Sequence, residues 1–198
     1  MLFGFAKYAT LIYCRIAFRM RYEGLENIPR GSGRGYLLCA NHRSYHDPVF
    51  LCHKIPQRLG FMAKAEIFRG RFISAVLKDL GAFPVNRGKG DTAALDKAAD
   101  IIRNGGVLIV FPEGTRSKDG RPLRPRSGAA VLSKRTGADL LCCSIHFDKP
   151  KLRFRSTVTL RFHPLLTYEN LGLESDSPSA IRDATKRIME TITSGLYS

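Results

Sequence analysis

The chain has 198 residues, 44% hydrophobic and 25% charged, which fits one globular domain with its own core rather than a disordered or repeat protein. The 32 Lys and Arg against 17 Asp and Glu give a formal charge of +15, so we expect an anionic partner: nucleic acid, acidic lipid or a phosphorylated substrate. Zinc-finger spacing, a basic region beside heptads and an RNA-recognition strand motif are all missing, which disfavours nucleic acid.

The five cysteines, at positions 14, 39, 52, 142 and 143, are odd in number and include no C-x-x-C pair. This argues against a zinc site and against a disulfide framework. We expect them to be small buried side chains in a reducing compartment, and we predict no metal site and no bound cofactor.

Residues 1–20 are strongly apolar, but Lys7, Arg15 and Arg19 interrupt them, so no stretch is long enough to span a bilayer. A cleavable signal peptide is also disfavoured, because a basic start followed by a clean apolar block is missing. At helical spacing, one broad apolar face contains Leu2, Phe5, Ala6, Ala9, Ile12, Tyr13, Ile16 and Met20. We predict that residues 1–25 form an N-terminal amphipathic helix that lies in the interface of a membrane with anionic lipid. The alternative, packing on its own core, would leave the other large apolar side chains exposed: Phe3, Tyr8, Leu11 and Phe18.

Strand and helix patterns alternate after residue 35, as is typical of an α/β domain. Apolar runs predict strands over residues 36–40, 59–63, 82–85, 107–111, 140–147 and 157–162. Helical spacing and end signals predict helices from Asp47-Pro48, over residues 67–80 and 91–104, and after Ser177-Pro178. We therefore predict a single α/β domain over residues 26–198, with a mixed central β-sheet flanked by helices. The strand at 157–162 alternates in residue type, which places it near a sheet edge.

His42 follows the first of these strands, and Asp47 opens the next helix five residues later. Side chains five apart on a continuous helix point about 140° apart, so the two can meet only across a loop. A carboxylate against one imidazole nitrogen fixes the tautomer and leaves the other nitrogen able to take a proton from a hydroxyl. The pair is thus a candidate for activating an alcohol toward an acyl carbonyl.

Simpler interpretations of the same residues remain open. Asp47 is a suitable N-cap for a helix with Pro48 at its first position, and His42 alone fits an ordinary loop histidine. A hydrolase using Ser44 is disfavoured, because no G-x-S-x-G elbow is available to present a nucleophile.

Two glycine-bearing turns, at residues 81–88 and 111–117, each place an arginine just beyond a short strand. Arg87 and Arg116 would form an anion cradle if the turns converge, since guanidinium groups bind phosphate in a bidentate manner. An exposed turn arginine is the simpler interpretation of either one. Glu113 does not fit a pure anion site, and we expect it to bond a substrate hydroxyl or to hold Arg116 in position.

Taken in order, residues 41–48, 81–87 and 111–117 closely resemble the three motifs of the 1-acyl-glycerol-3-phosphate acyltransferase family. The basic-acidic pair in residues 64–66 and the segment 126–129 are similar to further family features, and the resemblance covers roughly residues 35–147. A fourth motif usually has a proline in the strand after the third, and the corresponding run here, 140–145, has none.

The resemblance implies a glycerolipid acyltransferase-like fold, with residues 26–198 as the acyltransferase domain. It implies that His42 is the general base and Asp47 its orienting carboxylate. The residues that it assigns to the substrate are Lys64, Arg87, Glu113, Gly114, Thr115 and Arg116.

The implied reaction transfers a fatty acyl group from acyl-CoA or acyl carrier protein to the sn-2 hydroxyl of lysophosphatidic acid, giving phosphatidic acid. It needs no covalent enzyme intermediate, and the implied place is the cytoplasmic face of the membrane, as a peripheral or monotopic protein. Two alternatives stay open: another acceptor, such as glycerol-3-phosphate or a lyso-aminolipid, and, less favoured, a basic nucleic-acid-binding module. Pocket shape rather than motifs decides the acceptor and the acyl length.

Overall fold

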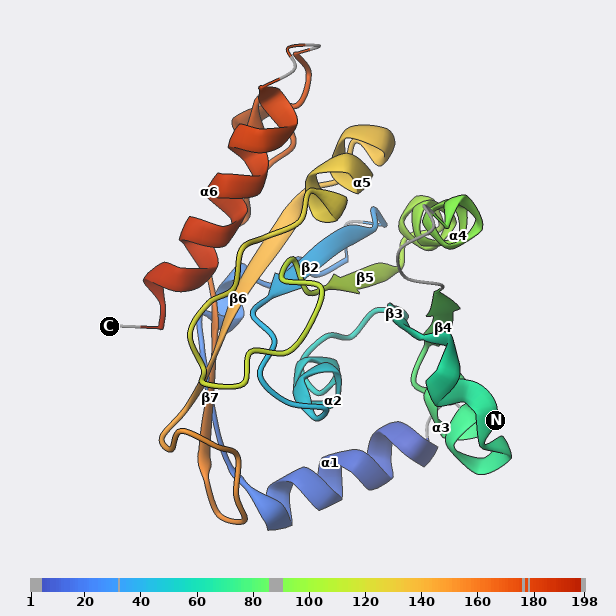
Figure 1. The fold of residues 1–198 in the computed structure, drawn as a ribbon, viewed down its shortest axis with the longest axis vertical. Coiled ribbons are helices and arrows are strands. Elements are labelled where there is room, and N and C mark those ends of the chain that lie inside the picture. Colours follow the sequence, from blue (N-terminus) through green and yellow to red (C-terminus); the bar gives the residue numbers. More distant parts are fainter. Residues whose placement is uncertain (1–4, 32, 86–90, 176, 178, 197–198) are drawn as a thin grey trace.

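The structure is a computed structural model that describes residues 5–31, 33–85, 91–175, 177 and 179–196. Within these residues seven strands form one mixed sheet, in the order β1-β7-β6-β2-β5-β3-β4 (Figure 1). The strands are Arg19–Glu23 (β1), Tyr36–Ala40 (β2), Leu59–Lys64 (β3), Ala82–Val85 (β4), Val107–Val110 (β5), Leu140–Phe147 (β6) and Thr157–Phe162 (β7).

Strands β2 to β6 run parallel to one another, so their carboxyl ends meet at one edge of the sheet. Strand β7 is antiparallel to β6, and β1 pairs in parallel with β7 at the outer edge. In sheets with parallel strands, ligands bind beyond the carboxyl ends. A ligand site is therefore expected among the segments that follow β2, β3, β4 and β5.

Helices cover both faces of the sheet (Figure 1): α1, α2 and α3 lie on one face and α4, α5 and α6 on the other. They run over Phe5–Ala17 (α1), Asp47–Cys52 (α2), Arg71–Asp79 (α3), Thr92–Arg103 (α4), Gly128–Thr136 (α5) and Ala180–Ser194 (α6). Short 3-10 turns occur at Leu25–Asn27 (η1), Ala65–Arg69 (η2) and Glu169–Leu171 (η3). The predicted α/β domain with a mixed, helix-flanked sheet is confirmed.

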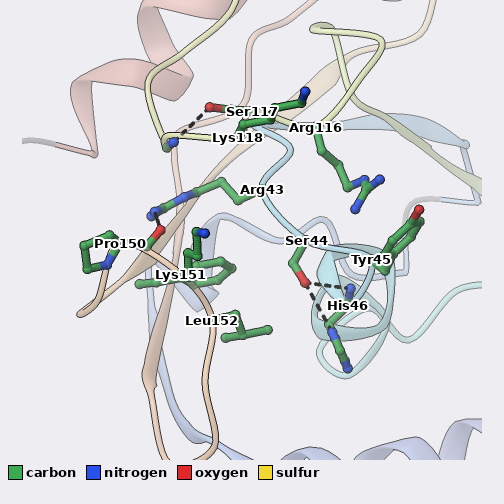
Figure 2. Close-up of a pocket in the computed structure, with 12 residues that line it drawn as sticks. Arg43, Ser44, Tyr45, His46, Arg116, Ser117, Lys118, Pro150, Lys151 and Leu152 are labelled. Atoms are coloured by element: carbon green, nitrogen blue, oxygen red, sulfur yellow. Dashed lines mark hydrogen bonds between the residues drawn. The ribbon is translucent and has the colours of Figure 1, made fainter.

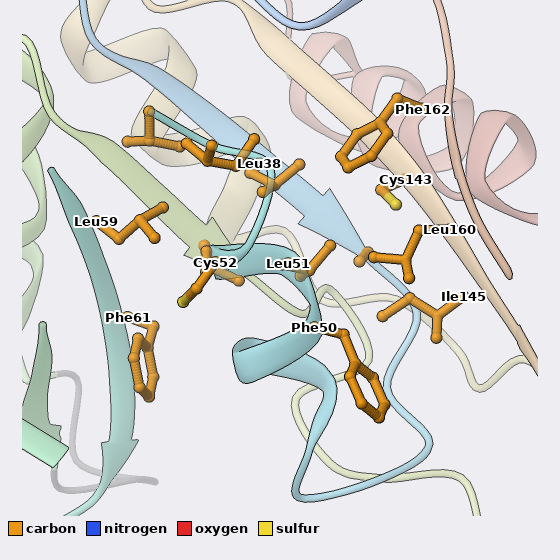
Figure 3. Packing of buried hydrophobic residues seen from close by; sticks show 14 of the residues in the cluster. Leu38, Phe50, Leu51, Cys52, Leu59, Phe61, Cys143, Ile145, Leu160 and Phe162 are labelled. Carbon is orange, nitrogen blue, oxygen red and sulfur yellow. The ribbon is translucent and has the colours of Figure 1, made fainter. Parts of the chain in front are cut away.

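The core has two halves because alternate residues of each strand point to opposite faces. On β2 the side chain of Leu38 packs toward α2 with Phe50 and Leu51, as Figure 3 shows, whereas Leu37 packs toward α5 and α6. All five residues of β2 are buried, as expected for a central strand that is covered on both faces. The predicted burial of the cysteines is also confirmed, and burial raises the pKa of the Cys14 thiol to about 11.

The predicted N-terminal helix is present but shorter than expected, since α1 ends at Ala17 and residues 19–23 form strand β1. Phe18 is buried in the core, contrary to the expectation that core packing would leave it exposed. The side chains of Tyr8, Ile12 and Ile16 do face solvent, with exposed fractions of 69%, 50% and 62%. Strand β1 was not predicted, because its residues alternate between exposed and half-buried and none of them is fully buried. Its sequence therefore does not stand out from the apolar helix pattern that precedes it.

Two other elements differ from the predictions. The helix predicted over 67–80 is divided into η2 and α3, because Gly70 has an extended backbone between them. Helix α5 was not predicted, since it is short, begins at Gly128 and has no side-chain cap. By contrast, strands β6 and β7 have the predicted bounds, and β7 lies near the sheet edge with only β1 outside it.

Candidate active site

The loop that carries His42 starts at a fixed point beside the sheet. Strand β2 pairs with β6 up to Ala40, and the buried side chain of Asn41 then continues the pairing in place of backbone. Its amide donates to the carbonyl of Ile145 at 2.9 Å, and its Oδ1 accepts from the Ile145 amide at 2.7 Å. His42 therefore leaves the sheet in a defined direction.

His42 and Asp47 meet across the loop, as the motif predicts. Their Nδ1 and Oδ2 atoms are 2.8 Å apart, and the same Oδ2 accepts from the backbone amides of Arg43 at 2.6 Å and Ser44 at 2.8 Å. Because an ionised carboxylate only accepts, Nδ1 of the neutral ring is the donor and Nε2 keeps its lone pair. The ring of His42 is thus held in one orientation, with Nε2 as its acceptor nitrogen.

The carboxylate of Asp47 is fully buried and does not cap helix α2. Asp47 is the first helical residue, His46 occupies the N-cap position, and the Asp47 side chain turns back to the loop. The capping interpretation of Asp47 is therefore wrong. Its Oδ1 atom has no hydrogen-bond partner among the described residues, so all three bonds fall on Oδ2.

The ring of His42 is also held from the side. It stacks on Phe111, with centroids 4.1 Å apart and planes inclined by 17°, and its side chain is 14% exposed. Phe111 follows β5, the neighbour of β2, so the adjacent strands bring these segments together. The stack restricts the imidazole to the plane in which Asp47 accepts from it.

The carboxylate of Glu113 holds the same loop through a hydrogen bond to its backbone. It is 3% exposed; its Oε1 accepts from the backbone amide of His42 at 2.8 Å, and its Oε2 from that of Leu123 at 2.9 Å. Burial raises the pKa of Glu113, although both hydrogen bonds act in the opposite direction. In place of the expected bond to a substrate hydroxyl or to Arg116, the structure shows a carboxylate that connects the loop carrying His42 to the loop after β5.

A cavity of about 690 Å³ opens beside His42 at the carboxyl ends of the parallel strands. Its lining includes four of the predicted substrate residues: Lys64, Gly114, Thr115 and Arg116. Apolar side chains make up much of the remaining wall: Phe61, Met62, Ile67, Leu77, Val85, Ile109 and Phe111. Glu113 is not part of the lining, and Arg87 lies outside the described residues.

Two lining residues, Tyr45 and Arg126, were not predicted as site residues. The guanidinium of Arg116 lies 3.4 Å from the centroid of the Tyr45 ring, a cation–π contact between two residues that line the cavity. Gly114 has φ +69°, and a Cβ built there would lie 3.0 Å from the Arg126 side chain. Arg126 belongs to a segment that the sequence marks only through the family resemblance, and Tyr45 carries no signal of its own.

The site is a paired His and Asp beside a cavity with cationic and apolar walls. A family model described as Acyltransferase matches residues 19–146, more than half of the chain. The chain belongs to this acyltransferase family. The match starts at β1 and ends within β6, so it contains every residue of the site described above.

Curated relatives of this acyltransferase are named 1-acyl-sn-glycerol-3-phosphate acyltransferase. The relative from Borreliella burgdorferi is 29% identical over 85% of this chain and 71% of its own length. Those from Bacillus subtilis and Streptococcus pneumoniae are 30% and 26% identical, over 59% and 89% of this chain. These two matches span only 57% and 62% of the relatives' own lengths.

A solved structure shares the fold of this acyltransferase. It is the crystal structure of the 1-acyl-sn-glycerophosphate acyltransferase PlsC from Thermotoga maritima, with a TM-score of 0.74 and 26% identity. The similarity covers 98% of this chain and 76% of that one, so the fold of this acyltransferase is shared almost throughout.

Among the described residues, no helix is both long enough and apolar enough to cross a bilayer. The same residues contain no group of three His, Cys, Asp or Glu side chains placed to hold a metal ion.

Proposed function

We propose that this chain transfers a fatty acyl group from a thioester donor to the sn-2 hydroxyl of 1-acyl-glycerol-3-phosphate, giving phosphatidic acid. The observation that carries the proposal is the 2.8 Å contact between His42 Nδ1 and Asp47 Oδ2 beside a cavity lined by Lys64 and Arg116. The names of the curated relatives, which all describe this reaction, support the choice of substrate.

The chemistry is direct transfer between two bound substrates. His42 Nε2 removes the proton of the acceptor hydroxyl as the oxygen attacks the thioester carbonyl, and the tetrahedral intermediate then expels the thiolate. The proton held by His42 passes to the thiolate, so the base is restored without a covalent enzyme intermediate or a further cofactor. The buried carboxylate of Asp47 stabilises the imidazolium that exists in between.

The acceptor phosphate is assigned to Lys64 and Arg116. Both line the cavity on which His42 opens, and the cation–π contact with Tyr45 limits the freedom of the Arg116 guanidinium. An arginine fork suits a phosphate monoester, whose oxygens accept two parallel bonds. We assign Thr115 and Gly114 to the same phosphate as neighbours in the turn, and Arg87 as the contribution of the segment after β4.

The apolar part of the cavity is assigned to acyl chains. Ile67 and Leu77 come from η2 and α3, so these elements form one wall between solvent and the parallel strands. A volume of about 690 Å³ falls in the range of ligand sites, roughly 300–1,000 Å³. Acyl-length choice should therefore respond to side-chain volume on this wall.

We further propose that the protein is peripheral at the cytoplasmic face of a membrane that contains anionic lipid. Helix α1 exposes Tyr8, Ile12 and Ile16 together with Arg15, the combination that interfacial helices use. Phe72 and Ile73 of α3, on the same face of the sheet, are 81% and 53% exposed. The net charge of +15 favours an anionic surface.

The test is an acyl-transfer assay with purified protein, in which lysophosphatidic acid is compared with glycerol-3-phosphate and acyl-CoA with acyl carrier protein. We expect turnover with lysophosphatidic acid and none by His42→Ala. His146→Ala is the matched control, because His146 is exposed on β6 and does not line the cavity. Circular dichroism checks that both variants fold.

Normal transfer by His42→Ala would refute the role of the base. Turnover with glycerol-3-phosphate alone would keep the chemistry and change the acceptor. Absence of transfer by the wild-type protein, combined with steeply salt-dependent oligonucleotide binding, would replace the proposal with a nucleic-acid-binding function.

A further inference from the structure

A second, smaller pocket is formed by the loop after His42, the loop after β5, and the end of β6 with the turn that follows it (Figure 2). It has a volume of about 260 Å³ and shares Tyr45 and Arg116 with the large cavity. Its lining includes four cationic side chains, Arg43, Arg116, Lys118 and Lys151, and no carboxylate from the described residues. The shared residues make it a continuation of the active site rather than a remote surface feature.

Arg43 is held in this pocket before a ligand arrives. Its guanidinium carbon lies 4.6 Å from the centroid of the Phe147 ring, and Nη2 donates to the carbonyl of Pro150 at 3.1 Å. Gly120 has φ +84°, and a Cβ built on it would lie 2.6 Å from Nη2, so glycine allows this close approach of the arginine. A guanidinium has five N–H donors, and the bond to Pro150 uses one of them.

The cations come from three segments that meet only in the folded chain. Arg43 belongs to the catalytic loop, Lys118 to the loop after β5, and Lys151 to the turn between β6 and β7. Figure 2 shows Arg43 between the strand turn that bears Pro150 and the loop that bears Lys118. None of the described residues that line the pocket is acidic, so an anion bound there would reduce the repulsion between these cations.

We infer that this pocket binds a phosphate of the acyl donor. The inference rests on the proposed function, in which two substrates must reach His42 together. The acceptor phosphate occupies the Lys64 side of the large cavity, so the donor needs an approach of its own. Acyl-CoA and acyl carrier protein share a phosphopantetheine arm that joins the thioester sulfur to a phosphate. Because the pocket and the large cavity share Tyr45 and Arg116, such an arm can hold its phosphate in the pocket while the thioester lies in the cavity beside His42.

The decisive experiment compares donors that carry the same acyl group on CoA, on 4′-phosphopantetheine, or on pantetheine without phosphate. We expect the wild-type protein to prefer the phosphorylated donors in kcat/KM, and Arg43→Gln and Lys151→Ala to reduce that preference about tenfold each, as for loss of a charged contact. For Lys151→Ala the KM for lysophosphatidic acid and the turnover of acyl-pantetheine should stay unchanged. Glutamine at position 43 retains the backbone amide that donates to Asp47.

Matched controls are available in the same segments. Lys149→Ala and Arg121→Gln remove one charge each from residues that do not line the pocket, and both should keep the wild-type preference. Equal loss toward all three donors in Arg43→Gln or Lys151→Ala, or a rise in acceptor KM alone, would overturn the inference while leaving the proposed function intact.

A binding measurement separates the inference from the proposed function. Titration calorimetry with CoA and with 4′-phosphopantetheine needs no turnover, and both variants should bind about tenfold more weakly than wild type and Lys149→Ala. Equal affinities would overturn the donor site. Sedimentation with phosphatidylglycerol vesicles tests the other source of phosphate: weaker vesicle binding by Lys151→Ala, with donor preference preserved, would assign the pocket to lipid headgroups and refute the inference.

Discussion

Replacing Asp47 with Asn separates the charge of the carboxylate from its geometry. Oδ2 of Asp47 accepts hydrogen bonds from three donors: His42 Nδ1 and the backbone amides of Arg43 and Ser44. An asparagine whose carbonyl oxygen takes the place of Oδ2 can accept all three bonds. The flipped amide is unfavourable, because its NH₂ group would face three other donors. The NH₂ group then takes the position of Oδ1, which has no hydrogen-bond partner among the described residues. The loop should keep its shape while the negative charge disappears.

The expected loss of kcat in Asp47→Asn follows from the hydrogen bond between residue 47 and His42 Nδ1. Hydrogen bonds to charged groups contribute about 1.5–3 kcal/mol and neutral ones about 0.5–1.5 kcal/mol, and the difference matters most when His42 has become an imidazolium. A loss of about 2 kcal/mol in the transition state corresponds to about a 30-fold lower kcat. The unpaired NH₂ costs about 1–3 kcal/mol of stability, partly offset because the buried charge no longer needs desolvation.

The assay is steady-state transfer to lysophosphatidic acid by Asp47→Asn and Asp47→Ala, with urea unfolding of both. Alanine removes the acceptor of all three donors, so it should reduce kcat further and lower the unfolding midpoint more than asparagine does. A kcat for Asp47→Asn within about twofold of wild type would refute the electrostatic role of Asp47. Equal unfolding midpoints for the two variants would refute the assumption that asparagine preserves the loop.

Four further outcomes follow from the structure. Burial raises the pKa of Glu113 above 4.5, so the folded protein holds the proton of this carboxyl more tightly than the unfolded chain does. Part of the wild-type stability is therefore lost as pH rises above 4.5. Glu113→Gln should lack this pH-dependent part, as urea unfolding midpoints measured against pH would show. Arg116→Ala should raise the KM for lysophosphatidic acid more than it lowers kcat, and an unchanged KM would place the phosphate elsewhere. Leu38→Ala, at a fully buried position of β2, should lower the free energy of unfolding by about 2–5 kcal/mol, measured in urea. Ile16→Ser, at a side chain that is 62% exposed, should weaken sedimentation with anionic vesicles and change the free energy of unfolding by no more than about 0.5 kcal/mol. Unaltered vesicle binding would count against α1 as the membrane contact.

The strands of the sheet interior were predictable because burial on both faces demands continuous apolar runs. Strand β6 begins and ends where the run at 140–147 does, and β5 is only one residue shorter than predicted. The edge strand β1 was not predictable in this way. One side of β1 has no strand neighbour, its residues are half exposed, and only pairing with β7 makes Arg19–Glu23 a strand.

For the site, the sequence predicts which segments converge but not how individual polar atoms pair. His42 and Asp47 follow from a motif whose chemistry requires the contact, and they meet. Glu113 was expected to bond a substrate hydroxyl or to hold Arg116 in position, because the sequence marks no other partner for this carboxylate. Its partners are the backbone amides of His42 and Leu123, groups that every residue except proline carries and that no sequence pattern marks.

The loop that carries His42 and the cavity wall formed by η2 and α3 have different roles in the site. His42 is fixed at its backbone by Glu113, at Nδ1 by Asp47 and across its ring by Phe111, so its position depends little on which substrate is bound. Lys64, by contrast, is 53% exposed at its side chain and forms an ion pair with the half-exposed Glu66. Because η2 and α3 pack at the margin of the sheet, their side chains can change in size without disturbing the base. Substrate preference should therefore respond to substitutions on that wall, whereas the transfer chemistry should respond to the loop.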